Sequence, residues 1–189
     1  MSNILIVTGS VRPNSVNKSV VEAVKKDLEA RDDVTVTVAD LAELNLPFFD
    51  SPTPPSADGY EAPHDSVKQW GKLVADSDGV VIVAPEYNHG LTGVQKNAID
   101  WLFKEWNEKS VAFVTYGWYA GAHSLAQFKE IGIVTKWSLG ETTTGLQFMK
   151  DINPDGSLAD EEAVTNSLKS TLDELLVNAT VETEASVLV

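Results

Sequence analysis

Short apolar runs recur along the chain and predict buried β-strands. Residues 3–8, 79–84 and 110–115 are nearly continuous runs rich in β-branched residues, and residues 34–38 alternate between valine and threonine. Runs of this length and composition are typical of parallel strands that are covered on both faces. A fifth strand is expected within residues 132–139, where the pattern is weaker.

Apolar residues at helical spacing lie between these runs. They occur within residues 16–28, 67–74, 94–102, 125–131 and 164–176. In each segment the apolar positions fall mainly three or four residues apart, which places them on one face of an amphipathic helix. The chain therefore alternates strand and helix from its start.

This alternation predicts a parallel sheet with helices on both faces. Five strands in 189 residues favour a flavodoxin-like three-layer α/β sandwich, with a five-stranded parallel sheet in the order 2-1-3-4-5, over a six-stranded dinucleotide fold. Residues 1–177 are expected to form this single domain. Residues 178–189 lack a pattern, which is typical of a disordered C-terminal tail. The proline-rich residues 41–60 are expected to form a surface loop or a cover rather than a linker.

The net charge of the chain limits which classes of partner it can bind. Twenty-eight acidic and 14 basic residues give a net charge of −14, while the hydrophobic content of 43% is ordinary for a globular protein. A nucleic-acid binder needs a basic face to meet phosphates, and an anionic membrane surface repels an acidic protein. Neither nucleic acid nor a membrane is therefore expected as a partner.

The chain has no cysteine. Disulfides, thiolate catalysis, iron–sulfur clusters and cysteine-ligated zinc are therefore excluded, and any redox chemistry must be carried by a cofactor. The apolar residues 4–7 are too few for a signal peptide or a membrane span. A cytoplasmic location is the expectation.

The loop after the first strand, residues 9–17, is the first candidate site, because ligands of such sheets bind beyond the carboxyl ends of the strands. Ser10, Ser15 and Asn17 would add hydrogen-bond donors to the free N–H groups at a helix start. Arg12 would add a positive charge, and this combination suits a monophosphate. Alternatively, Ser15 or Asn17 caps the helix and Arg12 is solvated. We favour the phosphate site, because a cap needs no cation.

The motif in this loop, Gly-Ser-x-Arg-x-x-Ser-x-Asn, resembles the NAD(P)H-dependent FMN reductase family, which includes quinone, azo-dye and chromate reductases. In that family the loop wraps the FMN phosphate. The resemblance therefore implies phosphate contacts from Ser10, Arg12, Ser15 and Asn17. The loop has groups for one phosphate only, which favours FMN over FAD.

A second motif follows the third strand and is similar to the Pro-Glu-Tyr-Asn signature of the same family. In the family this loop runs along the flavin ring. The resemblance implies that the flavin neighbourhood contains Pro85, Glu86, Tyr87, Asn88 and His89. The alternative is a turn stabilised by the Asn88 side chain, with Tyr87 packed in the core.

The third candidate loop, residues 115–122, follows the fourth strand. The family has a glycine-rich loop here that approaches the pyrimidine side of the flavin, and Gly117 and Gly121 fit that role. Tyr116, Trp118 and Tyr119 are bulkier than the family pattern. They are candidates to stack on the flavin or a nicotinamide, or to pack between subunits.

Two further constellations are discounted. Residues 151–162 match the calcium-loop template D-x-N-x-D-G-x5-E, but no helix precedes them, and an Asn-Pro-Asp-Gly turn before a capped helix explains the same residues. His64, His89 and His123 do not stand at metal-binding spacings, so no metal site is expected. Trp101 and Trp106 are expected to be packing or interface residues rather than catalytic ones.

The resemblance implies an FMN-dependent oxidoreductase with NAD(P)H as co-substrate. Electrons would pass through bound FMN to a small acceptor, such as a flavin, a quinone, an azo compound or a metal oxyanion. No catalytic side chain is expected, because flavin N5 carries the chemistry. The resemblance also implies a homodimer or homotetramer. The alternative function is a flavodoxin-like FMN electron carrier without NAD(P)H activity, whose acidic surface meets a basic partner.

Overall fold

The computed structural model describes residues 1–187, with side chains described through Thr180. Its strands are β1 (Ser2–Val7), β2 (Val34–Ala39), β3 (Gly79–Pro85), β4 (Ser110–Gly117), β5 (Ser138–Leu139) and β6 (Thr144–Gln147). Its helices are α1 (Asn17–Glu29), α2 (Leu41–Leu44), α3 (Asp65–Ala75), α4 (Gly93–Asp100), α5 (Ala122–Thr135) and α6 (Glu161–Val187), with a 3-10 turn η1 (Lys104–Trp106) before β4.

The strands form one parallel sheet in the order β2-β1-β3-β4-β5, which confirms the predicted order. Two short strands share the position beside β4. β5 pairs with the start of β4, at Ser110 and Val111, and β6 pairs with its end, from Val114 to Gly117. The fifth strand predicted within residues 132–139 is therefore only the first half of this edge.

The edge is interrupted by a side chain of α6. The Glu174 carboxylate accepts hydrogen bonds from the backbone N–H groups of Glu141 at 2.7 Å and Thr142 at 2.8 Å. An added Cβ at Gly140 would lie 2.7 Å from the carboxyl carbon, so a side chain there would displace this carboxylate. The amides between β5 and β6 are thus held by α6 rather than by β4.

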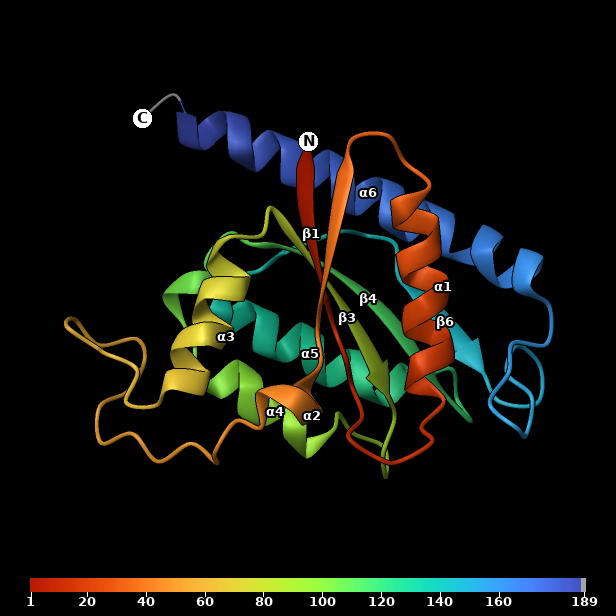
Figure 1. The fold of residues 1–189 in the computed structure, drawn as a ribbon, viewed down its shortest axis with the longest axis horizontal. Helices are drawn as coiled ribbons and strands as arrows, with labels where there is room; N and C mark the ends of the chain where they lie inside the picture. The colour runs from red at the N-terminus through yellow and green to blue at the C-terminus, as the bar shows by residue number, and fades with distance from the viewer. Residues whose placement is uncertain (188–189) are drawn as a thin grey trace.

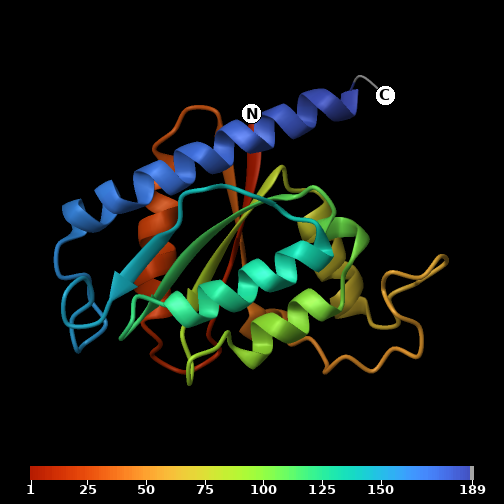
Figure 2. The same cartoon turned by 180° about the vertical axis from the view of Figure 1, so that it is seen from behind.

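Helices cover both faces of the sheet (Figures 1 and 2). α1 and α6 lie on one face, and α3, α4 and α5 lie on the other. Along β1, Ile4 and Ile6 pack with α1 and α6, whereas Leu5 and Val7 pack with α3 and α4. Both faces of the strand are buried, which explains why it reads as a continuous apolar run.

Tryptophan and phenylalanine rings fill the core on the α3 and α5 side. Trp70 and Trp106 meet edge to face with ring centres 5.9 Å apart, and Phe113 stacks on Phe128 at 4.8 Å. Trp101 and Trp106 are fully buried, which confirms that they are packing residues. Aromatic pairs of this kind stabilise a core beyond the area they bury.

The proline-rich segment before α3 covers the end of α4. The Pro47 carbonyl accepts a hydrogen bond from the indole N–H of Trp101 at 2.8 Å, and Phe49 packs edge-on against the same ring. Tyr60 donates to the Trp101 carbonyl at 3.2 Å. The segment is therefore a cover, as predicted, although it begins with the short helix α2, whose first turn is capped by Asp40.

The last helix continues beyond Asn178, where the sequence predicts an unpatterned tail. Leu168, Leu172, Leu175 and Ala179 are all buried, so the apolar stripe of α6 extends into the predicted tail. The side chains of residues 181–187 and all of residues 188–189 lie outside the described residues. Within the described chain, no helix has the length and apolar character needed to cross a membrane.

Candidate active site

Three loops leave the carboxyl edge of the sheet, which is the lower edge in Figure 1. The first loop (residues 8–16) joins β1 to α1, the second loop (residues 86–92) joins β3 to α4, and the third loop (residues 118–121) joins β4 to α5. Because neighbouring parallel strands end at the same edge, loops that are distant in the sequence become neighbours here.

Asn17 ties the first loop to β3. Its buried side chain accepts a hydrogen bond from the Gly9 N–H at 3.2 Å and donates one to the Val83 carbonyl at 3.2 Å. A Cβ added at Gly9 would lie 2.3 Å from the same carbonyl oxygen, so only glycine permits this approach. The Asn17 amide therefore has protein partners on both its oxygen and its nitrogen, and it positions the loop.

A pair of hydroxyl groups joins the first loop to the second. Ser10 Oγ lies 2.7 Å from the hydroxyl of Tyr87 and also accepts a hydrogen bond from the Arg12 N–H. The Arg12 side chain is exposed, with its guanidinium carbon 6.0 Å from the centre of the Tyr87 ring. Among the described residues no carboxylate pairs with Arg12, so its charge is available to an anion.

Ser15 lies at the start of α1. Its hydroxyl accepts a hydrogen bond from the Asn17 N–H at 3.2 Å and so satisfies the first N–H of the helix, although the N-cap residue itself, Val16, makes no side-chain capping bond. Capping and phosphate binding are compatible for this residue, since a serine hydroxyl can accept one hydrogen bond while donating another. The exposed Arg12, in contrast, has no role in the cap.

Tyr116, near the end of β4, brings a buried hydroxyl beside the first loop. The residue is 2% exposed, and its hydroxyl lacks a hydrogen-bond partner of normal geometry among the described residues. Burial raises the pKa of Tyr116 to about 12, against smaller opposing effects of hydrogen bonding from the Asn17 and Ser15 side chains, which lie close to the hydroxyl without meeting normal hydrogen-bond geometry. The group is thus a protonated donor at neutral pH. A buried polar atom without a partner is uncommon in folded proteins and points to a ligand or a water.

The second loop is a tight hairpin. Tyr87 and Gly90 exchange backbone hydrogen bonds of 2.9 and 3.0 Å, and the two residues between them, Asn88 and His89, have φ values of 50° and 60°. Two consecutive left-handed residues form a type I′ turn, in which asparagine is favoured. Tyr87 is half-buried and bonded to Ser10 rather than packed in the core, while Asn88 and His89 are exposed.

Pro85 and Glu86 join the second loop to β4 and α5. Pro85 is the last residue of β3 and pairs with Tyr116. The Glu86 side chain is only 5% exposed; one carboxylate oxygen accepts the His123 N–H at 2.9 Å, and the other lies 3.1 Å from Nδ1 of the same residue. A carboxylate at a helix start satisfies a free N–H group and complements the helix dipole. The Glu86 carboxylate is therefore directed to α5.

Two glycines bound the third loop: Gly117 ends β4, and Gly121 is the last residue of the loop. Gly121 has a φ of 74°, and a Cβ there would lie 2.4 Å from the Cβ of Thr115. A Cβ at Gly117 would lie 3.1 Å from the Cβ of Glu86, so this glycine lets the second and third loops meet. Trp118 and Tyr119, between the glycines, are 64% and 61% exposed. These two aromatic side chains therefore remain available at the loop edge.

Residues 2–142, which include all three loops, match the family model described as NADPH-dependent FMN reductase. The chain belongs to this family. Membership makes it an oxidoreductase enzyme, with FMN as cofactor and NAD(P)H as co-substrate.

Individual relatives agree with this membership. An NAD(P)H-dependent FMN reductase from Nectria sp is 34% identical over 155 residues, which is 78% of this chain and 76% of the relative. A quinone reductase from Escherichia coli is 34% identical over 101 residues, 52% of this chain and 49% of the relative. The solved structure of the NAD(P)H:acceptor oxidoreductase FerB from Paracoccus denitrificans shares the fold, with a TM-score of 0.73 over 94% of this chain and 99% of that chain at 23% identity.

Thr92 and Gln95 of this FMN reductase family member are not predicted as site residues. Gln95 donates from its side chain to the Val83 carbonyl, the same oxygen that Asn17 contacts, and Thr92 caps α4 through the Gln95 N–H. The spacing Thr-x-x-Gln is a capping-box signature, which could have indicated them. His123 is considered only for its spacing to other histidines, and only the fold brings it beside Glu86.

The calcium-like segment forms the predicted turn before a capped helix. Asp155 accepts hydrogen bonds from the backbone and hydroxyl of Ser157, and Asp151 accepts one from the Gln147 N–H. Asp160 accepts the Ala163 N–H at the start of α6. These carboxylates are thus turned to separate backbone groups, as expected of a turn and a cap.

Proposed function

We propose that this enzyme holds FMN at the three loops and passes two electrons from NAD(P)H to a small planar acceptor, with a quinone as the first candidate. The buried Tyr116 hydroxyl carries the proposal. It lies beside the first loop, near the unpaired charge of Arg12, and it has no hydrogen-bond partner of normal geometry in the described part of the chain. A phosphate group offers several oxygens that accept from such donors.

The residues of the first loop fit a monophosphate. Arg12 would supply the countercharge, and Ser10 and Ser15 would supply hydroxyl groups close to the start of α1. Asn17 would act mainly by holding Gly9 and the loop against β3. With the phosphate held here, the type I′ turn of the second loop and the glycines of the third loop are proposed to border the flavin ring.

The chemistry would come from bound FMN, which accepts a hydride from a reduced nicotinamide and returns two electrons to an acceptor. The chain's own part is to bind, to orient and to exclude water. Trp118 and Tyr119 present exposed aromatic faces at the same edge, and planar rings stack favourably on such faces. The proposal of a quinone rests on these faces and on the quinone reductases among the relatives.

Stopped-flow spectroscopy on FMN-loaded protein tests the function in two steps. Anaerobic NADH or NADPH should bleach the oxidised flavin band, and 1,4-benzoquinone should then restore it while one hydroquinone forms per nicotinamide oxidised. Protein that fails to bind FMN would contradict the cofactor site. Flavin that is reduced but not reoxidised by quinone would contradict the acceptor and leave the cofactor site standing, so azo dyes and chromate follow as comparison acceptors.

We also propose that the enzyme is a homodimer or homotetramer. Ile133 and Val134 on α5 are 73% and 67% exposed, and Val134 borders a hollow of about 380 Å³ between α4 and α5. Contiguous exposed apolar side chains are typical of association surfaces. Light scattering after gel filtration gives the mass directly, and a monomeric mass at micromolar concentration would contradict this proposal.

A further inference from the structure

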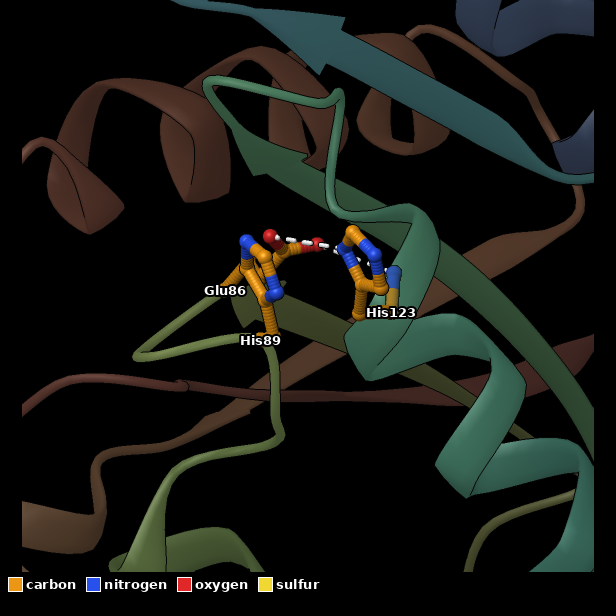
Figure 3. A group of neighbouring side chains, drawn as sticks. All are labelled: Glu86, His89 and His123. Atoms are coloured by element: carbon orange, nitrogen blue, oxygen red, sulfur yellow. Dashed lines mark hydrogen bonds and ion pairs between the residues drawn. The ribbon is translucent and has the colours of Figure 1, made fainter.

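Glu86, His89 and His123 form a compact cluster between the second loop and the start of α5 (Figure 3). Each side chain offers one ligand atom such that the three atoms all lie within 4.8 Å of one another. The two imidazole rings are stacked, with centres 4.0 Å apart and planes 6° from parallel. Glu86 and His89 are three residues apart in the second loop, whereas His123 is 37 residues beyond Glu86 and is brought to them only by the fold.

We propose that this cluster binds one divalent transition-metal ion of the zinc class. Two imidazoles and one carboxylate are a ligand set that proteins use for zinc with an open coordination position. The chain has no thiolate that would compete for such an ion. The proposal goes beyond the reductase function and does not depend on it, because all three ligands belong to the protein.

One side of the site is already in place. Glu86 Oε1 and His123 Nδ1 are 3.1 Å apart, and two ligands of a tetrahedral zinc ion lie about 3.4 Å apart at ordinary bond lengths. Glu86 is fixed by its second bond to the His123 N–H, and its side chain is 5% exposed. An ion can therefore take the place of the proton between these two atoms with little movement of either residue.

His89 would close the site. It is exposed on the two-residue turn, so its ring can tilt from the stacked position toward the carboxylate. Tyr119 meets both imidazoles edge-on, with ring centres 5.5 and 5.6 Å away, and limits the space on one side. The fourth position remains for water. The negative charge of Glu86 offsets the partial positive charge at the start of α5, which by itself disfavours a cation.

Titration calorimetry of Zn²⁺ into untagged full-length protein tests the site, after chelator treatment and with or without FMN. One ion should bind per chain. His89→Asn, which retains a residue that tolerates positive φ, and His123→Gln should each weaken binding at least tenfold. The matched control is His64→Asn, because His64 pairs with Asp50 away from the cluster and should leave the affinity unchanged.

A second measurement guards against misfolding of the variants. Added Zn²⁺ should shift the imidazole NMR signals of His89 and His123 in the unaltered protein and leave those of His64 in place. Equal affinity in the unaltered protein, His89→Asn and His123→Gln would overturn the proposal, as would the absence of saturable binding. FMN binding is read separately in the same samples, so failure of the metal site is distinguishable from failure of the reductase function.

Discussion

Under the proposed function, the Tyr116 hydroxyl affects both the stability of the fold and the binding of FMN. It lies in the same core cluster as β1 and α1, yet it has no hydrogen-bond partner of normal geometry within the described chain. An unsatisfied buried hydroxyl costs about 1–3 kcal/mol. A ligand that accepts its hydrogen bond would recover part of this free energy, whereas a phenylalanine would remove the penalty without a ligand.

We therefore predict that Tyr116→Phe stabilises the FMN-free protein but weakens the binding of FMN. The free energy of unfolding of FMN-free protein should rise by about 1 kcal/mol, and FMN affinity should fall by roughly tenfold, the scale of one hydrogen bond. Urea unfolding with and without FMN and fluorescence titration measure both. A variant that is less stable without FMN and binds it normally would show that the hydroxyl serves the fold instead.

Arg12 is the residue that distinguishes the proposed phosphate site from an ordinary helix cap. Arg12→Ala should weaken FMN binding by about 1.5–3 kcal/mol, the range for hydrogen bonds to charged groups. Lys26→Ala is the matched control, since Lys26 is an exposed cation of α1, and its removal changes the net charge equally. FMN titrations of both variants decide the point, and equal affinities would remove Arg12 from the site.

For single residues, the sequence predicts which side chains are chemically suited to a site better than it predicts which contacts they make. Arg12 and Ser10 are recognisable as anion-binding types in a loop before a helix. Asn17 and Glu86 form hydrogen bonds with partners 66 and 37 residues away, and local sequence patterns do not indicate such distant partners. Tyr116 could not be assigned for the same reason, because its environment is made by the first loop.

Elements are predicted well where burial is continuous. β1, β3 and β4 are covered on both faces, and their apolar runs are unmistakable. β5 and β6 contain two and four residues, too few for any periodicity to appear. Their separation depends on Glu174 reaching back from α6, which is a tertiary contact.

Glu174 makes this edge of the sheet sensitive to acid. Hydrogen bonds from the Thr142 hydroxyl and from the N–H groups of Glu141 and Thr142 lower the pKa of Glu174 in the folded protein. A lowered folded-state pKa stabilises the fold above the unfolded pKa, and this contribution is lost as the pH falls through the folded value.

Glu174→Gln should accordingly lower stability at pH 7 by roughly 0.5–1 kcal/mol, the scale of a solvent-exposed charged contact. The difference from the unaltered protein should shrink toward roughly pH 3, below the ordinary glutamate pKa. Urea midpoints at several pH values test this, with Glu22→Gln as an exposed control on α1. A difference that does not change with pH would show that the carboxylate charge is not involved.

For the whole molecule the dominant electrostatic feature is the net charge of −14. Most ion pairs of the described residues lie on the surface, where each contributes little. Repulsion among the excess carboxylates should therefore prevail over the pairs. The net charge follows from the count of acidic and basic residues, and the order of the sheet is predicted from the alternation of strands and helices. Both can therefore be predicted from the sequence without knowledge of any single contact.

We predict that sodium chloride stabilises the folded protein. Raising the salt concentration shortens the Debye length and screens the self-repulsion, so the urea midpoint at pH 7 should rise between low and moderate ionic strength. Potassium chloride should act alike, because screening does not depend on the cation. A midpoint that falls with salt would mean that the attractive pairs outweigh the repulsion.

The ties between the loops have a consequence for how such an enzyme can diversify. Asn17 and Gln95 both donate hydrogen bonds to the Val83 carbonyl of β3, and Glu86 accepts one from the His123 N–H at the start of α5. None of these hydrogen bonds involves the exposed side chains of the third loop. Among the described residues, Trp118 and Tyr119 make ring contacts only with Phe148, His89 and His123, so their replacement would leave these backbone ties in place. Under the proposed function, a change of acceptor would then require new side chains at a few solvent-facing positions and no change in the backbone ties between the loops.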